Sequence, residues 1–368
     1  MKLALQFDAS VGINVLRQVI QAAGENTTIA FNAAHGLDIG DLLSVVSAAG
    51  SDKQLVLGFD GARLTPRNLQ QATSFAGERT AIEIGKAQNV NTSALLAVIN
   101  AAGHGKQVKV SFNGAQADDE ALRQLVDAAG RQVGIDINAG HAVPIERLLG
   151  IIDAASREGG LGLEFNGAQL LEANILQAVE RAAGSTAIGI NSAHAVKQET
   201  LQAVMQAAGD GTHLGLSFHG GQLDDKGLLA AIEAAGTNTQ IKVNTAQAMG
   251  AGALLLSINA TANTKRFSVE FNGAELPFGN LQQAVEAAGI NTAISVNTAQ
   301  AMDPQALHSA IEAAGDLKRL DAQFNATQMA AESLGQWVGA AGSRVGLTIA
   351  AAQALPLPTL LEAVQAAG

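Results

Sequence analysis

The sequence predicts an open right-handed solenoid of strands and helices, a horseshoe with a parallel sheet on its concave face and helices on its convex face. Two series of core residues support this prediction, because internal repetition at a fixed period is typical of repeat architectures. The first has one gap of 52 residues and then gaps of 53: Phe7, Phe59, Phe112, Phe165, Phe218, Phe271 and Phe324. The second has gaps of 53 throughout: Phe31, Ile84, Ile137, Ile190, Val243, Val296 and Ile349. We therefore expect one domain over residues 1–368, with seven 53-residue blocks and fourteen strand–helix units.

Each block begins with an odd unit and ends with an even one. Residues 163–170 of an odd unit and 294–301 of an even unit alternate apolar and polar side chains, which predicts a strand. Residues 175–184 and 306–315 then carry apolar side chains at helical spacing and are rich in good helix formers.

The ends of the predicted helices carry residues that favour those positions. Asp118, Asp224 and Asp303 stand where an N-terminal cap is expected, and Pro304 fits the first helical position. Glycines such as Gly50, Gly130, Gly236 and Gly315 stand at the ends, where a left-handed residue is common.

The helix of each unit supplies the crossover that parallel strands need, and such crossovers are right-handed. Alanine-rich inner faces such as 48–49 and 128–129 let the helices approach closely, which predicts gentle curvature. A closed βα barrel is the alternative. Eight strands take about 250 residues in such a barrel, and fourteen would leave an unfilled lumen, so the open form is favoured.

Composition excludes several classes of function. The net charge of −11 and the pI of about 5.1 argue against nucleic acid and against an anionic membrane surface. No apolar run reaches the roughly 20 residues that a membrane span needs, and the chain enters its first repeat without a signal peptide. The absence of cysteine excludes disulfides and thiolate metal sites. We expect a cytoplasmic location, or delivery into a host cytosol.

The repeats resemble leucine-rich repeats, whose pattern is L-x-x-L-x-L-x-x-N-x-L. Leu163, Phe165 and Leu170 match the strand core and the later leucine, with Ala168 at the asparagine position; a register shifted by two places Asn166 there instead. A helix in every unit is similar to the ribonuclease-inhibitor-like subclass, including the GALA-type repeats of bacterial effectors. The resemblance covers the whole chain and implies a horseshoe used for protein–protein interaction.

Asparagine or aspartate follows the last core position of eleven strands. Six members are taken as a structural ladder: Asn113, Asn166, Asn191, Asn244, Asn272 and Asn297. Such side chains either bond the neighbouring turn backbone, which asparagine does routinely, or present amides to a ligand.

Histidine or glutamine stands three residues further on in most units, for example His141, Gln169 and His194. Equivalent residues two units apart lie about 10 Å from one another by strand spacing, too far to share one metal ion. Glutamine also replaces histidine freely here. We therefore expect hydrogen bonding and neither a metal site nor a cofactor.

The residues just before the two core series face the concave surface and vary between repeats. The candidate binding residues on this surface are Glu83, Asp136, Glu164, Lys242 and Glu270, together with His219, which interrupts the ladder. The acidic group Glu83, Asp136 and Glu164 suits a protein partner with a basic surface.

No catalytic constellation is evident, since the carboxylate pairs at 118–119 and 224–225 stand at expected helix caps. The sequence thus predicts a non-enzymatic scaffold that binds a protein on its concave strand face. One alternative is a target-selecting segment of a bacterial effector or multidomain protein. Others are a structural array that self-associates through uncapped ends, and an artificial repeat protein.

Overall fold

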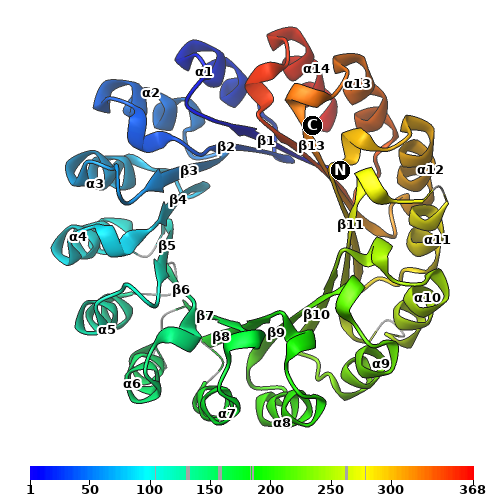
Figure 1. The fold of residues 1–368 in the computed structure, drawn as a ribbon. Helices are drawn as coiled ribbons and strands as arrows, with labels where there is room; N and C mark the ends of the chain where they lie inside the picture. The colour runs from blue at the N-terminus through cyan, green and yellow to red at the C-terminus, as the bar shows by residue number, and fades with distance from the viewer. Residues whose placement is uncertain are drawn as a thin grey trace. The chain divides into compact units, whose positions relative to one another are not determined.

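The computed structural model describes residues 1–103, 105–129, 133–155, 160–182, 184, 186–261, 264–277 and 279–368. These residues form two compact lobes. The N-terminal lobe contains residues 6–189, and the C-terminal lobe contains residues 1–5 and 190–368. In both lobes the helices cover one face of a parallel sheet (Figure 1).

The strands have the predicted alternation of buried and accessible residues. Their bounds are β1 (Lys2–Phe7), β2 (Thr27–Phe31), β3 (Gln54–Asp60), β4 (Thr80–Gly85), β5 (Gln107–Asn113), β6 (Val133–Asn138), β7 (Gly160–Asn166), β8 (Thr186–Asn191), β9 (His213–His219), β10 (Thr239–Asn244), β11 (Arg266–Asn272), β12 (Thr292–Asn297), β13 (Arg319–Asn325) and β14 (Val345–Ala350). A three-residue 3-10 turn such as η2 (Ala87–Asn89) follows most of them.

An α-helix follows each strand and its turn. The helices are α1 (Ile13–Ala22), α2 (Ile39–Ala49), α3 (Pro66–Phe75), α4 (Thr92–Ala102), α5 (Asp119–Ala128), α6 (Ile145–Ala155), α7 (Glu172–Arg181), α8 (Gln198–Ala208), α9 (Asp225–Ala234), α10 (Ala251–Ala260), α11 (Asn280–Ala287), α12 (Pro304–Ala314), α13 (Ala331–Ala340) and α14 (Leu357–Ala367). None of the described helices is both long and apolar enough to cross a membrane.

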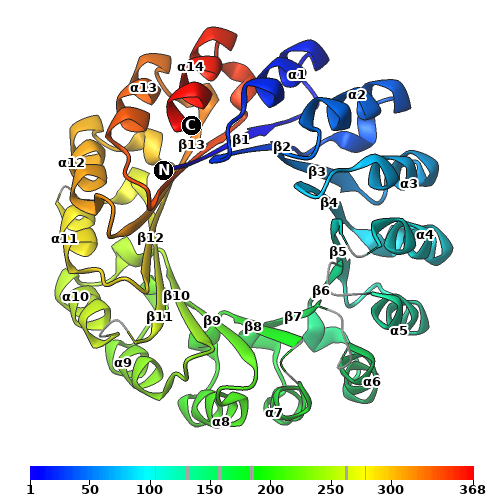
Figure 2. The same ribbon diagram turned by 180° about the vertical axis from the view of Figure 1, so that it is seen from behind.

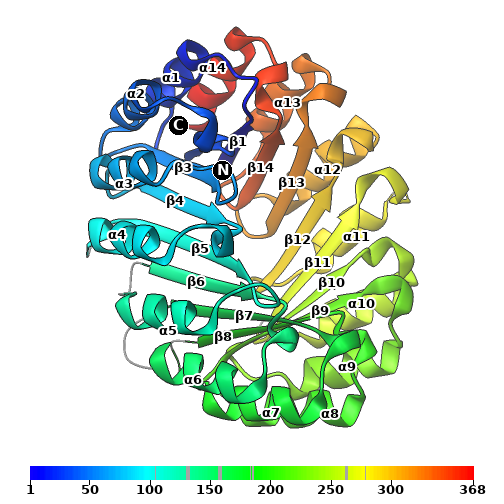
Figure 3. The same ribbon diagram turned by 60° about the vertical axis from the view of Figure 1, so that its left-hand side comes forward.

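The predicted open horseshoe is wrong, because the strand order closes on itself. In the N-terminal lobe β2 to β7 pair in sequence. In the C-terminal lobe β9 to β14 do the same, and β14 also pairs with β1, Leu5 opposite Ile349 (Figure 3). The full order is that of a closed barrel of fourteen strands. The first and last strands therefore bond to each other, which removes the exposed strand edges expected at the ends of a solenoid.

The core lies between each sheet and its helices. Leu161, Leu163 and Phe165 of β7 are at most 2% exposed, and they pack on the side covered by the helices. Ile175 and Val179, one helical turn apart, are among the buried residues on the side of α7 that faces the sheet. The helices of the C-terminal lobe, α9 to α13, stand side by side in the same way (Figure 2). The predicted odd and even core series are thus confirmed.

The predicted N-terminal caps are confirmed as well. Asp118 accepts a hydrogen bond from the backbone N of Ala121 at 2.8 Å, and Asp303 accepts one from that of Gln305 at 3.3 Å. Such caps satisfy backbone donors that have no partner within the helix. Gly50 and Gly315 end α2 and α12 with φ of 59° and 50°, whereas the glycine predicted to end a helix at position 130 lies outside the described residues.

Lysines at one repeat position cap the C-terminal ends of odd helices. Lys106 Nζ donates to the carbonyl of Thr73 in α3 at 2.8 Å, Lys265 Nζ bonds the carbonyl of Ala235 after α9, and Lys318 Nζ donates to that of Glu286 in α11 at 3.1 Å. A cation at this end of a helix also meets the negative pole of the helix dipole. The repeat thus uses a long side chain from one unit to finish the helix of the preceding unit.

Glycine is required where two helix ends meet. A Cβ built on Gly236, after α9, would lie 2.8 Å from the carbonyl oxygen of Gly209, which ends α8. This nearest atom belongs to the backbone, so the clash cannot be relieved by a side-chain movement.

Replacing Gly236 by alanine should therefore destabilise the protein, by about 1–3 kcal/mol. The matched control is Gly335→Ala in α13, where a Cβ meets nothing within 4 Å and alanine should stabilise the helix by about 1 kcal/mol. Thermal unfolding followed by circular dichroism measures both. A Gly236→Ala variant as stable as the parent would contradict the close approach.

Candidate functional site

The asparagines that end the odd strands hold their own turns. Asn113 Oδ1 accepts from the backbone N of Ala115 at 3.0 Å, and Asn166 Oδ1 accepts from that of Ala168 at 3.0 Å. Asn272 does the same with Ala274 at 3.2 Å. These are Asx turns, in which the side chain imitates a backbone turn.

The asparagines that end the even strands behave differently. Asn297 Nδ2 donates to Glu270 Oε1 at 2.6 Å, on the sheet face away from the helices. The Oδ1 atoms of Asn244 and Asn297 are buried without a hydrogen-bond partner among the described residues. Asn191 occupies the same position at the end of β8. The six predicted ladder residues therefore divide into two structural classes.

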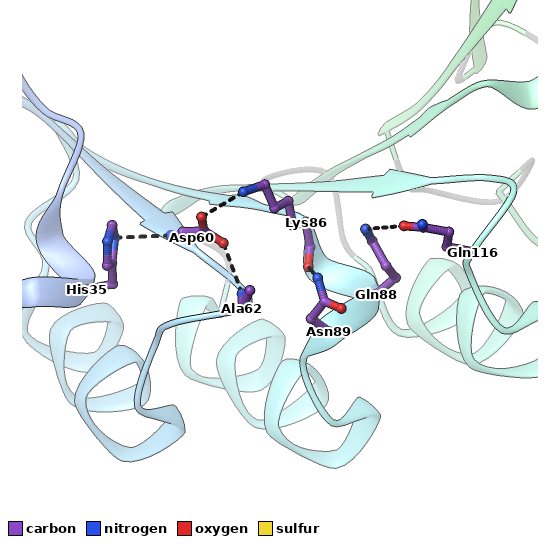
Figure 4. A network of polar contacts seen from close by, with 7 residues as sticks. All are labelled: His35, Asp60, Ala62, Lys86, Gln88, Asn89 and Gln116. Carbon is purple, nitrogen blue, oxygen red and sulfur yellow. Dashed lines mark hydrogen bonds and ion pairs between the residues drawn. The ribbon is translucent and has the colours of Figure 1, made fainter.

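The histidines and glutamines of the even turns bond the backbone of the next odd strand. The ring Nδ1 of His141 accepts from the backbone N of Asn166 at 3.2 Å, and Gln88 Oε1 accepts from that of Asn113 at 3.2 Å. His35 and Asp60 make the same contact at 3.3 Å, and Gln88 Nε2 continues to Gln116 at 3.1 Å (Figure 4). Both side-chain types offer an acceptor at the same place, which explains why glutamine replaces histidine.

The even turns also contain a left-handed residue that is not glycine. The residue after the strand has φ between 51° and 57° in six turns, at Lys86, Ala139, Ser192, Thr245, Thr298 and Ala351. Its carbonyl approaches the preceding odd turn, where a Cβ on Gly220 would lie 2.6 Å from the oxygen of Thr245. Lys86 uses its position to reach Asp60 at 2.9 Å (Figure 4). This hydrogen bond, assisted by the one from Ala62, lowers the pKa of the Asp60 carboxyl.

Removing the acceptor from an even turn should be costly, while exchanging one acceptor for another should not. Gln300 Oε1 accepts from the backbone N of Asn325 at 3.0 Å. Gln300→Leu leaves this donor without a partner, and we expect a loss of about 1–3 kcal/mol in the free energy of unfolding.

Gln300→His is the matched control, because histidine makes this bond at three other turns, and it should retain most of the stability. Chemical denaturation of the two variants provides the comparison. Equal losses would show that the acceptor is not what the turn requires.

Three of the six predicted binding residues gather in the N-terminal lobe, on the sheet face away from the helices. Glu83 on β4, Asp136 on β6 and Glu164 on β7 all carry carboxylates toward this face. Lys109 on β5 lies among them: it pairs with Glu83 in the strand register, and its Nζ is 2.7 Å from Asp136 Oδ2. We call these four residues the carboxylate cluster.

Lys109 was not among the residues predicted from the sequence. Apart from His219, the predicted residues all stand just before a core phenylalanine, isoleucine or valine, a position that Ser111 occupies on β5. Lys109 precedes it by two residues and thus faces the same side. A period of two along the strand would have identified it.

Glycines leave room for two of these carboxylates. A Cβ on Gly162 would collide with the carboxylate of Asp136, and one on Gly189 would collide with that of Glu164. Asp136 and Gly162 are directly opposite in the register of β6 and β7. The carboxylates therefore lie against the neighbouring strand.

The remaining predicted residues lie in the C-terminal lobe. Lys242 Nζ is 2.6 Å from Glu270 Oε2, so this pair is neutral. His219 ends β9; its backbone N donates to His194 Nδ1 at 3.2 Å, and the two rings meet edge to face with centroids 6.3 Å apart. Burial, together with repulsion from His219, lowers the pKa of His194.

Among the described residues, no group of three or more histidine, aspartate or glutamate side chains could hold a metal ion. The carboxylate cluster is instead organised around an ammonium group. The hydrogen bond to Asp136 raises the pKa of Lys109, and the charges of Glu83 and Glu164 act in the same direction against desolvation. Lys109 therefore stays protonated and is unsuited to nucleophilic chemistry, which needs a neutral amine.

The raised pKa of Lys109 predicts a pH dependence. Its contribution to stability is complete below the unfolded pKa of about 10.5 and is lost as the pH rises through the higher folded value. The difference in melting temperature between the parent and Lys109→Met should therefore shrink between about pH 10 and 12. Melting curves across this range measure it, and a constant difference would contradict the ion pair.

Comparisons with known proteins support the repeat fold. No family model and no curated protein matches the chain. Among solved structures, the leucine-rich repeat-containing protein LegL7 from Legionella pneumophila has a TM-score of 0.51 at 10% identity, over 69% of this chain and 86% of that one. The chain thus has a leucine-rich-repeat-like fold.

Weaker likenesses are to enzymes. The 3-dehydroquinate dehydratase from Aquifex aeolicus has a TM-score of 0.27 at 11% identity, over 52% of this chain and 88% of that one. The sialic acid aldolase from Aliivibrio salmonicida has a TM-score of 0.28 at 13% identity, over 56% and 71%. With scores this low, neither assigns a reaction to the chain.

The predicted function is corrected by these findings. A protein-binding scaffold with an open concave face is wrong, because the closed strand order provides no open arc. The prediction that the chain is not an enzyme came from the lack of an evident catalytic constellation in the sequence. The closed parallel strand order contradicts it, because enzymes of the βα-barrel class share such a closed order. The predicted effector segment, structural array and artificial repeat protein find no support either.

Proposed function

We propose that the carboxylate cluster of the N-terminal lobe binds a small organic polycation of the polyamine class. The observation that carries the proposal is the ion pair of Lys109 with Asp136, at 2.7 Å on an accessible sheet face. The carboxylates already accept one ammonium group at hydrogen-bonding distance, which is the contact that a polyamine would make.

The charge of the cluster supports a further cation. Glu83, Asp136 and Glu164 supply three carboxylates against the single ammonium of Lys109, which leaves a formal charge of −2. The corresponding face of the C-terminal lobe differs, since Lys242 pairs with Glu270. The cluster therefore contains more carboxylates than ammonium groups.

The surface around the cluster has room for a ligand. Gly134 lies beside Lys109 in the register, and a Cβ there would meet nothing within 4 Å. The carboxylates of Asp136 and Glu164 occupy the space over Gly162 and Gly189, so they lie against the sheet and leave the space above it open. A flexible chain of methylene groups with spaced ammonium groups can contact carboxylates on several strands at once, which a compact cation cannot do.

The sequence led to the expectation of a protein partner with a basic surface. The ligand proposed here is also positively charged, but it is a small molecule instead of a protein. We further propose that the repeats are of the ribonuclease-inhibitor-like, GALA-type subclass, which the helix in every described unit supports.

Calorimetric titration with spermine at low salt tests the proposed function. Neutral replacements of the same shape, Glu83→Gln, Asp136→Asn and Glu164→Gln, should each weaken binding about fivefold, and together they should abolish it. Lys109→Met should strengthen binding, because it removes the internal competitor and raises the charge of the cluster from −2 to −3. Raising the salt concentration should weaken all of these interactions.

Glu270→Gln in the C-terminal lobe is the matched control and should leave spermine affinity unchanged. The proposal fails if the triple variant binds spermine as the parent does, or if the control loses as much affinity as the cluster variants. If spermine binds no more tightly than a lysine-rich peptide does, the result would indicate a protein partner instead.

A further inference from the structure

Two exposed apolar residues of the C-terminal lobe depart from the repeat. Ile290, after α11, is 57% exposed, and Leu317, after α12, is 71% exposed. At the position of Ile290 the other blocks have Glu25, Glu78, Arg131, Gly184, Thr237 and Ser343. At the position of Leu317 they have Asp52, Gly105, Glu158, Gly211 and Thr264. The scaffold is built with polar residues or glycine at both places, so it does not itself require an apolar pair.

The two residues border a groove of about 420 Å³, within the range of small-molecule sites. Its other side is formed by Ile258, Asn259 and Thr261 at the end of α10. Helix α10 is followed by Thr261 with φ of −69°, whereas the even helices α8 and α12 are followed by left-handed glycines. The groove thus lies where the regular helix ending is altered.

Arg344 holds both borders of the groove in place. Its Nη2 donates to the carbonyl of Ile290 at 3.0 Å, and its Nη1 donates to that of Leu317 at 3.1 Å. One guanidinium therefore fixes two turns that are separated by 27 residues in sequence. Because the carbonyls are fixed, the two side chains form a preformed apolar border.

One positive charge lines the groove. Among its described lining residues Lys318 is the one charged side chain. Lys318 Nζ bonds the carbonyls of Glu286 and Ala288, which leaves one ammonium proton for a ligand. The neighbouring carboxylate of Asp316 is engaged by the backbone N of Ser343 at 2.7 Å. The groove thus combines apolar surface with an ammonium group in a chain whose net charge is −11.

We propose that this groove binds a small amphipathic anion, a medium-chain alkyl carboxylate. The alkyl chain lies along Ile290 and Leu317, where its burial provides most of the affinity. The carboxylate lies at the ammonium of Lys318, with the unused donors of Arg344 beside it. The site is independent of the carboxylate cluster, since it lies in the other lobe and selects the opposite charge.

Calorimetric titration with decanoate, below its micelle concentration, tests the inference. We expect saturable binding of decanoate, and none of acetate or of decyltrimethylammonium. The double variant Ile290→Thr/Leu317→Thr should bind at least about tenfold more weakly, because the apolar border is lost. Threonine already stands at both positions in another block, so the fold should be retained, as circular dichroism can verify.

Leu171→Thr is the matched control, since Leu171 is 66% exposed, belongs to the N-terminal lobe and does not line the groove. It should bind decanoate as the parent does. Lys318→Gln should remove the preference for decanoate over decanol. The inference is overturned if decanoate does not bind, if the double variant keeps full affinity, or if decyltrimethylammonium binds equally well.

Discussion

The fold depends on one type of hydrogen bond, which recurs at every second turn along the sheet. A histidine or glutamine of an even turn accepts a hydrogen bond from the backbone N–H at the end of the next odd strand. Gln247 Oε1, for example, accepts from the backbone N of Asn272 at 3.0 Å. Most odd turns are closed instead by the asparagine or aspartate that ends their own strand, as at Asn113, Asn325 and Asp60. Two turn types therefore follow each other, and this explains why the period is 53 residues rather than half of it. Burial supplies the stability of each unit, whereas this polar contact determines which turn can stand next to which.

The elements could be read from the sequence because each one has a local signal. Residues 163–170 were predicted as a strand and 175–184 as a helix, and the structure has β7 at Gly160–Asn166 and α7 at Glu172–Arg181. Closure could not be read in this way. It depends on a small difference between helix spacing and strand spacing, which accumulates over fourteen units and has no signal in any single one. The left-handed even turns were missed for a related reason: the usual sign of that conformation is glycine, and positions such as Lys86 and Ala139 have none.

Charge is distributed unevenly over a nearly uniform backbone. The N-terminal lobe gathers Glu83, Asp136 and Glu164 around one lysine, whereas Lys242 and Glu270 in the C-terminal lobe neutralise each other. The sequence indicated the carboxylates but not Lys109, since the register that brings Lys109 beside Glu83 is a property of the paired strands. The same framework thus carries different chemistry at equivalent positions, and glycines such as Gly162 decide how closely a side chain may lie against it.

The pairing of β1 with β14 has a consequence for biosynthesis. Lys2 is opposite Gly346, so the contact that completes the sheet joins a strand to a partner strand that is synthesised much later. Until then the outer edge of β1 has open backbone donors and acceptors on a growing chain, and such edges invite pairing with other molecules. The entropic cost of closing so long a loop rises only with the logarithm of its length. Pairing of β1 with β14 is therefore limited more by the time needed to synthesise β14 than by the free energy of loop closure. The seam is therefore the place where synthesis of this protein is most exposed to aggregation and where a chaperone would have most effect.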